Sequence, residues 1–355
     1  MGEPHRRIAC QAARDTADRH GQPNALDAQE VALPRPSTEF PRAAAWLQRA
    51  IDDGKLSDAV FGVADSSGVL QLRGFGADPD SRFALFSITK PLVGLVTLQL
   101  IEEGLLSPDT PLSSALAGVD RNRGGVIRLR HLLTHSAGIH DPALDDPTPL
   151  RAALTNAGQD FTPGSALRYS SIAFEGVAAL AESVSGTDLA DLLLQIDPDL
   201  AFDRPEHAVI GGERVGLDPT VVNENRHPGA GLTSRAATLL TVGSSLLRTL
   251  KTSHPGIVTE PTLRSSLRPR TTGLPELIGG PMNRTYGLSW HLRKGSTNLL
   301  DDDVFGHAGA SGTQWWFYLR RDVVMVMLTN VLDLPGIGVD VDQLNNAFVT
   351  DLERA

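Results

Sequence analysis

Helical and strand-like patterns of apolar residues alternate along the first third of the chain. A helix-spaced segment is followed by two short apolar runs joined by a turn-forming sequence, which predicts a helix and a β-hairpin. A third short run leads directly into a long helix-spaced segment that ends at a glycine. These segments comprise residues 42–51, 60–64, 69–72, 83–86 and 88–103.

The later parts of the chain follow two further patterns. Residues 106–260 are rich in Leu, Ala, Pro and turn-forming residues, which predicts short helices with long connections. Strand-like runs then return, and tight connections such as 320–322 favour antiparallel pairing. The C-terminal segments are four strand-like runs, 285–292, 304–307, 313–319 and 323–329, and a helix-spaced segment, 341–352.

This order of elements predicts an α+β fold in which an antiparallel sheet is flanked by helices. We expect residues 39–105 and 262–355 to build the sheet domain, with residues 106–261 inserted as a mostly helical region. Residues 1–38 are polar and rich in Ala, Arg, Asp and Pro, so we expect an N-terminal extension there.

Charge and cysteine content bear on the partners and the cellular location of this protein. The 355 residues include 32 Lys and Arg against 42 Asp and Glu, a net charge of −10, which disfavours nucleic acid or an anionic membrane as partner. Cys10 is the single cysteine, so no intramolecular disulfide can form. The N-terminal stretch lacks the apolar core of a signal peptide, and no run approaches the roughly 18 apolar residues of a membrane helix. We therefore expect a cytoplasmic protein; the sequence indicates no oligomeric state.

The segment Ser87-Ile88-Thr89-Lys90 carries the clearest chemical signal. It lies where a strand-like run meets a long helix, and one helical turn separates Ser87 from Lys90, so both side chains share a face. A serine there lies at a helix N-terminus, which favours negative charge. A desolvated lysine beside the hydroxyl can act as a base or lower the pKa of another base. The pattern predicts a nucleophilic serine.

Two further segments follow in a suggestive order. Tyr169-Ser170-Ser171 precedes a helix-spaced run, and His307-Ala308-Gly309 enters a glycine-rich turn. With these segments the chain resembles the superfamily of class C β-lactamases and penicillin-binding proteins, in its esterase-like branch. That superfamily is marked by Ser-x-x-Lys, Tyr-x-Asn and Lys-Thr-Gly, the last often His-x-Gly. Additional similar segments are residues 132–138, 229–234 and 286–290, and the resemblance spans about residues 40–350.

The resemblance implies a β-lactamase/transpeptidase-like fold and a role for each matching residue. Ser87 is expected to be acylated, and Lys90 and Tyr169 to form the base system, with Lys90 as the cation that helps Tyr169 reach its phenolate form. The backbone N–H groups of Ser87 and Ala310 are expected to form the oxyanion hole. The residues expected to bind substrate are Ser171, His307, Gly309 and Trp315.

Two departures from the family motifs bear on the substrate. Ser171 replaces the motif Asn and offers no amide to the acyl side of a substrate. His307 replaces the lysine of β-lactamases, and a largely neutral imidazole attracts a carboxylate weakly. We therefore expect a serine hydrolase of small esters or amides that uses no metal and no cofactor. An acyltransferase, a D-amino-acid peptidase or β-lactamase, and a non-catalytic ligand-binding relative are the alternatives.

Other residues offer competing sites. Ser136 lies in an incomplete nucleophile elbow, with Asp301–Asp303 and His307 following in α/β-hydrolase order, but the first glycine of that motif is absent.

Three histidines, three aspartates and two tryptophans offer candidate metal-binding and substrate-binding positions. A zinc site at His131, His135 and His140 lacks the metalloprotease glutamate, and Asp301–Asp303 lacks the rest of a calcium loop. Trp315 and Trp316 alternate across a strand, so we expect one in the core and one able to line a cleft.

Overall fold

The computed structural model describes residues 39–120, 123–254, 256–277, 284–294, 299 and 303–353. The expected N-terminal extension, residues 1–38, lies outside these ranges. Within them, no helix combines the length and apolar character that crossing a membrane requires.

A seven-stranded antiparallel sheet joins residues from both ends of the described chain. The N-terminal hairpin lies at one edge, and its first strand pairs with the last strand of the chain, so that Val60 lies opposite Leu328. In spatial order the strands are β2 (Gly68–Phe75), β1 (Ala59–Asp65), β9 (Val323–Thr329), β8 (Gln314–Tyr318), β7 (Val304–Ala308), β6 (His291–Leu292) and β5 (Thr285–Tyr286).

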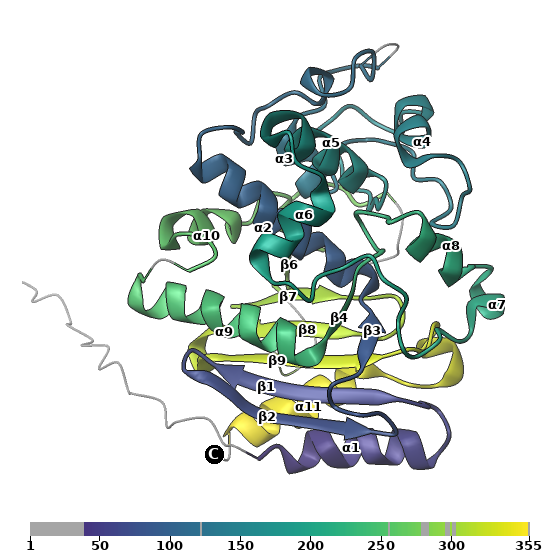
Figure 1. Ribbon diagram of the computed structural model, residues 1–355, viewed down its shortest axis with the longest axis vertical. Coiled ribbons are helices and arrows are strands. Elements are labelled where there is room, and N and C mark those ends of the chain that lie inside the picture. The colour runs from purple at the N-terminus through teal and green to yellow at the C-terminus, as the bar shows by residue number, and fades with distance from the viewer. Residues whose placement is uncertain are drawn as a thin grey trace, which may run out of the picture. The chain divides into compact units, whose positions relative to one another are not determined.

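Helices cover both faces of this sheet (Figure 1). Helices α1 (Pro41–Asp52) and α11 (Val341–Glu353) pack together on one face, against side chains such as Phe61 and Met325. Helix α9 (Ala236–Thr252) packs on the other face, against β1, β2 and β9. Because both faces are covered, β1 is buried along nearly its whole length, and its apolar run shows no polar alternation.

Two glycines let α9 approach the sheet closely. A Cβ atom on Gly62 of β1 would lie 2.5 Å from Leu240 Cδ1, and one on Gly243 of α9 would lie 2.8 Å from Val324 Cγ1. Side chains at these positions would force the two layers apart.

The remaining helices build the part of the molecule above the sheet in Figure 1. Helix α2 is central there and contacts both α5 and α6, while α3 packs on α5. These elements are α2 (Thr89–Glu102), α3 (Leu129–Leu133), α4 (Leu150–Asn156), α5 (Ala173–Ser185), α6 (Leu189–Ile196), α7 (Gly212–Val215), α8 (Pro219–Glu224) and α10 (Glu260–Ser266).

The expected fold class is confirmed, and one expected element is wrong. Residues 285–292 form two short strands rather than one, because residues 287–290 make a turn between β5 and β6. In this turn the Gly287 N–H donates to the Trp290 carbonyl at 2.9 Å, and Ser289 adopts a φ of 69°. Helix α9 belongs to the range expected for the helical insert but packs on the sheet; the boundaries at residues 105 and 261 stay a prediction.

Candidate active site

Ser87 lies in a strained turn between a short strand and α2. Strand β3 (Arg82–Ala84) pairs with β4 (Thr233–Arg235), and the 3-10 turn Phe86–Ile88 then leads into α2. Phe86 has a φ of 46°, which is costly for a bulky residue and is maintained because its ring is buried with Val222 and Leu332. This backbone presents the half-buried Ser87 side chain at the start of the helix.

Lys90 is fully buried and holds three oxygen partners. Its Nζ lies 3.1 Å from Ser87 Oγ, 3.1 Å from Ser171 Oγ and 2.7 Å from the Gly229 carbonyl oxygen. The ammonium form can donate one proton to each oxygen. The neutral amine can still donate to Ser171 and Gly229 while its lone pair faces the Ser87 hydroxyl. The site is therefore compatible with either protonation state.

Burial favours the neutral state at both members of the expected base system. Desolvation lowers the pKa of Lys90 to about 7, and the nearby Asp141 opposes this change. Desolvation raises the pKa of Tyr169 well above its usual value, although a hydrogen bond with Ser87 acts in the opposite direction. At neutral pH an uncharged Lys90 is thus more accessible than a Tyr169 phenolate, and the division of roles expected from the sequence stays a prediction.

Tyr169 lies between Lys90 and a histidine. Lys90 Nζ is 4.7 Å from the centre of the Tyr169 ring, and the His135 ring stacks on the ring at 4.3 Å between centroids. The Ser170 N–H donates to His135 Nδ1 at 3.1 Å, which fixes the imidazole beside the tyrosine. Desolvation, together with the Lys90 charge, lowers the pKa of His135 far below its usual value, so this ring is neutral.

Asp141 organises the segment that carries Tyr169 and Ser171. Its carboxylate accepts hydrogen bonds from the Ser170 hydroxyl at 2.7 Å, the Ser171 N–H at 3.0 Å and the Ile172 N–H at 2.9 Å, just before α5. An acid at a helix N-terminus is electrostatically favourable. Sequence reasoning missed Asp141, because no spacing connects it to Tyr169.

The turn after β7 is locked to the nucleophile turn. Thr313 Oγ1 donates to the Leu85 carbonyl at 3.2 Å, and a Cβ on Gly309 would lie 2.5 Å from that same oxygen. Only glycine fits there, and β7 contacts the Ser87 turn directly. Ala310 is exposed in this turn, and within the described residues its N–H makes no backbone hydrogen bond. These contacts bring the expected oxyanion segment to the expected nucleophile.

His307 is buried in the same region and is neutral. Its Nδ1 lies 2.8 Å from the Ala308 carbonyl oxygen, its ring centre is 6.1 Å from that of Tyr169, and its Nε2 has no hydrogen-bond partner among the described residues. Desolvation, with the Lys90 charge, lowers the pKa of His307 far below its usual value. The imidazole therefore adds no permanent positive charge to the site.

Trp315 lies away from any surface. Its side chain is fully buried and packs against Trp290 and Phe317, at 5.8 Å and 5.1 Å between ring centres. Trp316 is buried in the opposite core, because helices cover both faces of the sheet. The alternation of the two tryptophans is as expected, but neither is left to line an open cleft, and these contacts do not support a substrate role for Trp315.

Among the described residues, Ser136 and Asp303 of the competing sites have hydrogen-bond partners of their own. Ser136 Oγ lies 2.8 Å from Thr134 Oγ1, in a loop that follows helix α3, whereas a nucleophile elbow follows a strand. Asp301 and Asp302 lie outside the described residues, and Asp303 Oδ2 accepts from the Arg320 N–H at 2.8 Å.

The three histidines considered for zinc have separate partners. His131 Nδ1 accepts from the Arg128 N–H, His135 binds the Ser170 backbone, and His140 Nδ1 lies 3.1 Å from Asp160 Oδ1. In the part of the chain that the structure describes, no three His, Cys, Asp or Glu side chains gather as a metal site would require.

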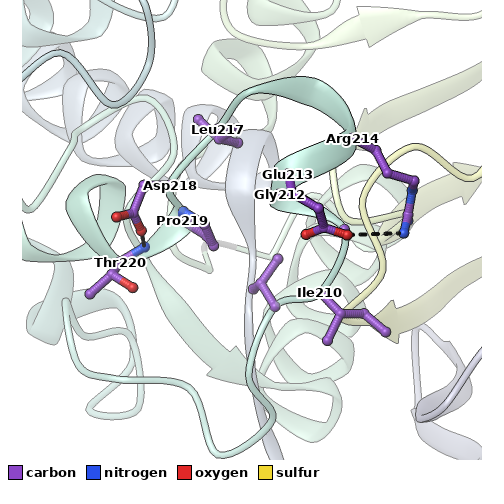
Figure 2. Close-up of a pocket in the computed structure, with 10 residues that line it drawn as sticks. Ile210, Gly212, Glu213, Arg214, Leu217, Asp218, Pro219 and Thr220 are labelled. Carbon is purple, nitrogen blue, oxygen red and sulfur yellow. Dashed lines mark hydrogen bonds and ion pairs between the residues drawn. The ribbon is translucent and has the colours of Figure 1, made fainter.

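The cavity in Figure 2 does not include Ser87. It has a volume of about 590 Å³, and all its lining residues come from 209–220, around α7 and α8. Two of them, Val209 and Leu217, pack against the cluster that contains Phe86. The cavity therefore touches the cluster around Phe86, while Ser87 is not among its lining residues.

Comparison with known proteins shows the family of this chain. The family model described as Beta-lactamase matches residues 43–346, most of the chain. This chain belongs to the Beta-lactamase family. The match covers every expected site residue, from Ser87 to Trp315.

Individual relatives are similar over different lengths. Esterase EstB of Burkholderia gladioli is 30% identical over 182 residues, which are 42% of this chain and 46% of the esterase, less than half of that relative's length. A penicillin-binding protein homologue from Caulobacter crescentus has a TM-score of 0.71 at 18% identity, covering 90% of this chain and 98% of that one. EstCE1, described as a hydrolase with promiscuous acyltransferase activity, has a TM-score of 0.68 at 19% identity, covering 88% and 97%. Both solved structures share the fold.

Proposed function

We propose that this protein is a serine hydrolase that cleaves small esters or amides through an acyl-enzyme on Ser87. The observation that carries the proposal is the 3.1 Å contact between Lys90 Nζ and Ser87 Oγ, in surroundings that lower the pKa of Lys90 to about 7. A base with a pKa near the working pH is largely unprotonated and still binds a proton strongly enough to take it from a hydroxyl. The similarity to EstB, a protein named as an esterase, supports the same reaction class.

The reaction begins with proton transfer from Ser87. Neutral Lys90 takes the hydroxyl proton as Ser87 Oγ bonds to the substrate carbonyl carbon, and the carbonyl oxygen becomes an oxyanion held by the Ser87 and Ala310 N–H groups. When the intermediate collapses, the leaving group receives a proton from the Lys90–Tyr169 pair and departs, which leaves the acyl-enzyme. Water then attacks the ester carbonyl and gives a proton to the pair. When this second intermediate collapses, the pair returns the proton to Ser87 Oγ, which frees the acid and Ser87.

Selectivity is proposed to follow from the two motif departures. Neutral His307 and the short Ser171 side chain, whose hydroxyl binds Lys90, offer little to a substrate carboxylate or an acyl-side amide. This favours uncharged esters and simple amides over β-lactams. Transfer to an alcohol or amine in place of water is the second candidate, because EstCE1 is described with acyltransferase activity. The cytoplasmic location and the substrate roles of Gly309 and Trp315 stay predictions.

The decisive experiment compares p-nitrophenyl acetate and butyrate hydrolysis by the wild type and by Ser87→Ala, with intact-mass detection of an acyl adduct. We expect turnover and adduct in the wild type, and a loss of at least about a thousandfold, with no adduct, in the variant. Ser136→Ala is the matched control and should retain both. Activity that survives in Ser87→Ala and disappears in Ser136→Ala would assign the chemistry to the other serine.

A further inference from the structure

Tyr169 faces charged and titratable groups from several elements. Among the described residues, those that face or electrostatically influence it are Lys90 of α2, His135 after α3, Asp141 before α5, Arg284 and Tyr286 at β5, and His307 of β7. Burial keeps both histidines neutral, and it raises the pKa of Tyr286, which stays a neutral phenol. The cations in this set are thus Lys90 and Arg284.

The two cations differ in the pH range over which they stay charged. Lys90 gives up its charge near pH 7, because its pKa is lowered to about 7. A guanidinium remains protonated throughout this range. Arg284 Cζ lies 5.4 Å from the centre of the Tyr169 ring. When Lys90 is the neutral base, Arg284 is therefore the cation of this set that still acts on Tyr169.

Arg284 is held near Tyr169 by an ion pair with Glu276 and by backbone hydrogen bonds between the two segments. Its Nε donates to Glu276 Oε1 at 2.7 Å, and the Glu276 side chain is almost fully buried. The segment around Glu276 is joined to the segment before Tyr169, since the Leu277 N–H donates to the Leu167 carbonyl at 2.9 Å and the Leu167 N–H donates to the Pro275 carbonyl at 2.8 Å. The guanidinium and the tyrosine are thus carried by one hydrogen-bonded unit.

We propose that Arg284, anchored by Glu276, is a positioning residue that holds a permanent positive charge over Tyr169 and keeps the Tyr169 hydroxyl able to exchange protons with Ser87 and the leaving group. Its charge stabilises the negative charge that develops on the phenol oxygen as the proton leaves. This inference rests on the proposed hydrolase function.

The test is the pH dependence of kcat/KM for p-nitrophenyl acetate in Arg284→Met, Arg284→Lys and the wild type. Removing a cation makes the Lys90–Tyr169 pair lose its proton less readily, so the rising limb in Arg284→Met should move to higher pH by about one to two units. From a pKa of about 7, this should lower the rate at pH 7 by about fivefold to fiftyfold. Arg284→Lys keeps the positive charge, so its pH profile should return most of the way to that of the wild type.

Arg293→Met is the matched control. Arg293 Cζ lies 5.1 Å from the Trp316 ring and pairs with Asp342, so the substitution removes an equivalent cation–aromatic contact away from Tyr169. Its pH profile should coincide with that of the wild type, and thermal unfolding should show all variants folded.

A double mutant separates electrostatics from packing. If Arg284 acts through the Tyr169 hydroxyl, Arg284→Met should cost little in a Tyr169→Phe background. An equal loss in both backgrounds, or a uniform loss at every pH with no recovery in Arg284→Lys, would overturn the proposal. A wild type that matches Ser87→Ala in showing no turnover would instead refute the hydrolase function, and this inference with it.

Discussion

Lys90 shows how one buried side chain links activity to stability. Its pKa falls from 10.5 to about 7 on folding because burial penalises the charge. Between these two values the unfolded chain binds more protons than the folded one, so stability rises with pH across that window. The cost is fully present below pH 7 and disappears above about pH 10.5.

We therefore expect Lys90→Met to abolish hydrolysis and yet to stabilise the fold at pH 7. The gain should be on the order of 2 kcal/mol, because relief from desolvation is partly offset by the unpaired Gly229 carbonyl. Urea unfolding at pH 7 and pH 9.5 measures it, and the difference from the wild type should shrink at the higher pH. A difference independent of pH would show that the Lys90 pKa is not lowered.

Sequence reasoning at this scale found the residues that share local spacing. Ser87 and Lys90 lie one turn apart, so the spacing itself indicates their contact. Arg284, Asp141 and His135 reach Tyr169 only through tertiary packing, and no sequence interval reports that proximity. The burial that sets the protonation of Lys90 and Tyr169 is likewise a property of the folded core.

At the scale of elements, the contact of α9 with the sheet depends on glycine. Gly243→Val places a branched side chain where even a Cβ atom would lie 2.8 Å from Val324 Cγ1. We expect a loss of about 3 kcal/mol in unfolding free energy from overpacking. Thr241→Val, on the exposed side of the same helix, is the control and should change stability by about 0.5 kcal/mol or less. Equal effects in urea unfolding would mean that the close approach does not constrain position 243.

The elements that could be predicted from the sequence are those whose ends are marked by turn-forming residues or glycine. The N-terminal hairpin and helix α2 were predicted within a few residues, because turn residues and a terminal glycine mark their ends. The turn at residues 287–290 was missed because Tyr286, Leu288 and Trp290 alternate with smaller residues as in a strand. Ser289 nevertheless adopts a left-handed backbone, which Leu133 stabilises by accepting the Ser289 N–H at 2.9 Å.

At the scale of the whole described molecule, the two ends of the chain are joined by Asp351 of α11. Its buried carboxylate accepts the Arg42 and Ala43 N–H groups at the start of α1, at 2.9 Å and 3.1 Å, and pairs with the Arg42 guanidinium. The carboxylate thus serves as the N-terminal cap of a helix more than 300 residues away in sequence.

We expect Asp351→Ala to lower the unfolding free energy by about 2–3 kcal/mol, because two N–H groups lose their acceptor. The kcat/KM of the folded protein should remain unchanged, since the cap lies on the face of the sheet away from α9. Denaturant titration and the ester assay check the two statements together. Asp351→Asn retains one acceptor oxygen and should lose less, and an effect as large as that of alanine would contradict a capping role.

The pairing of β1 with β9 has a consequence for biosynthesis. During translation β1 emerges about 260 residues before the strand that lies beside it. Until then one hydrogen-bonding edge of β1 lacks its final partner, and the Ser87 turn cannot receive the contact from Thr313. The nascent chain is thus exposed to aggregation for most of its synthesis and acquires its catalytic arrangement only at the end.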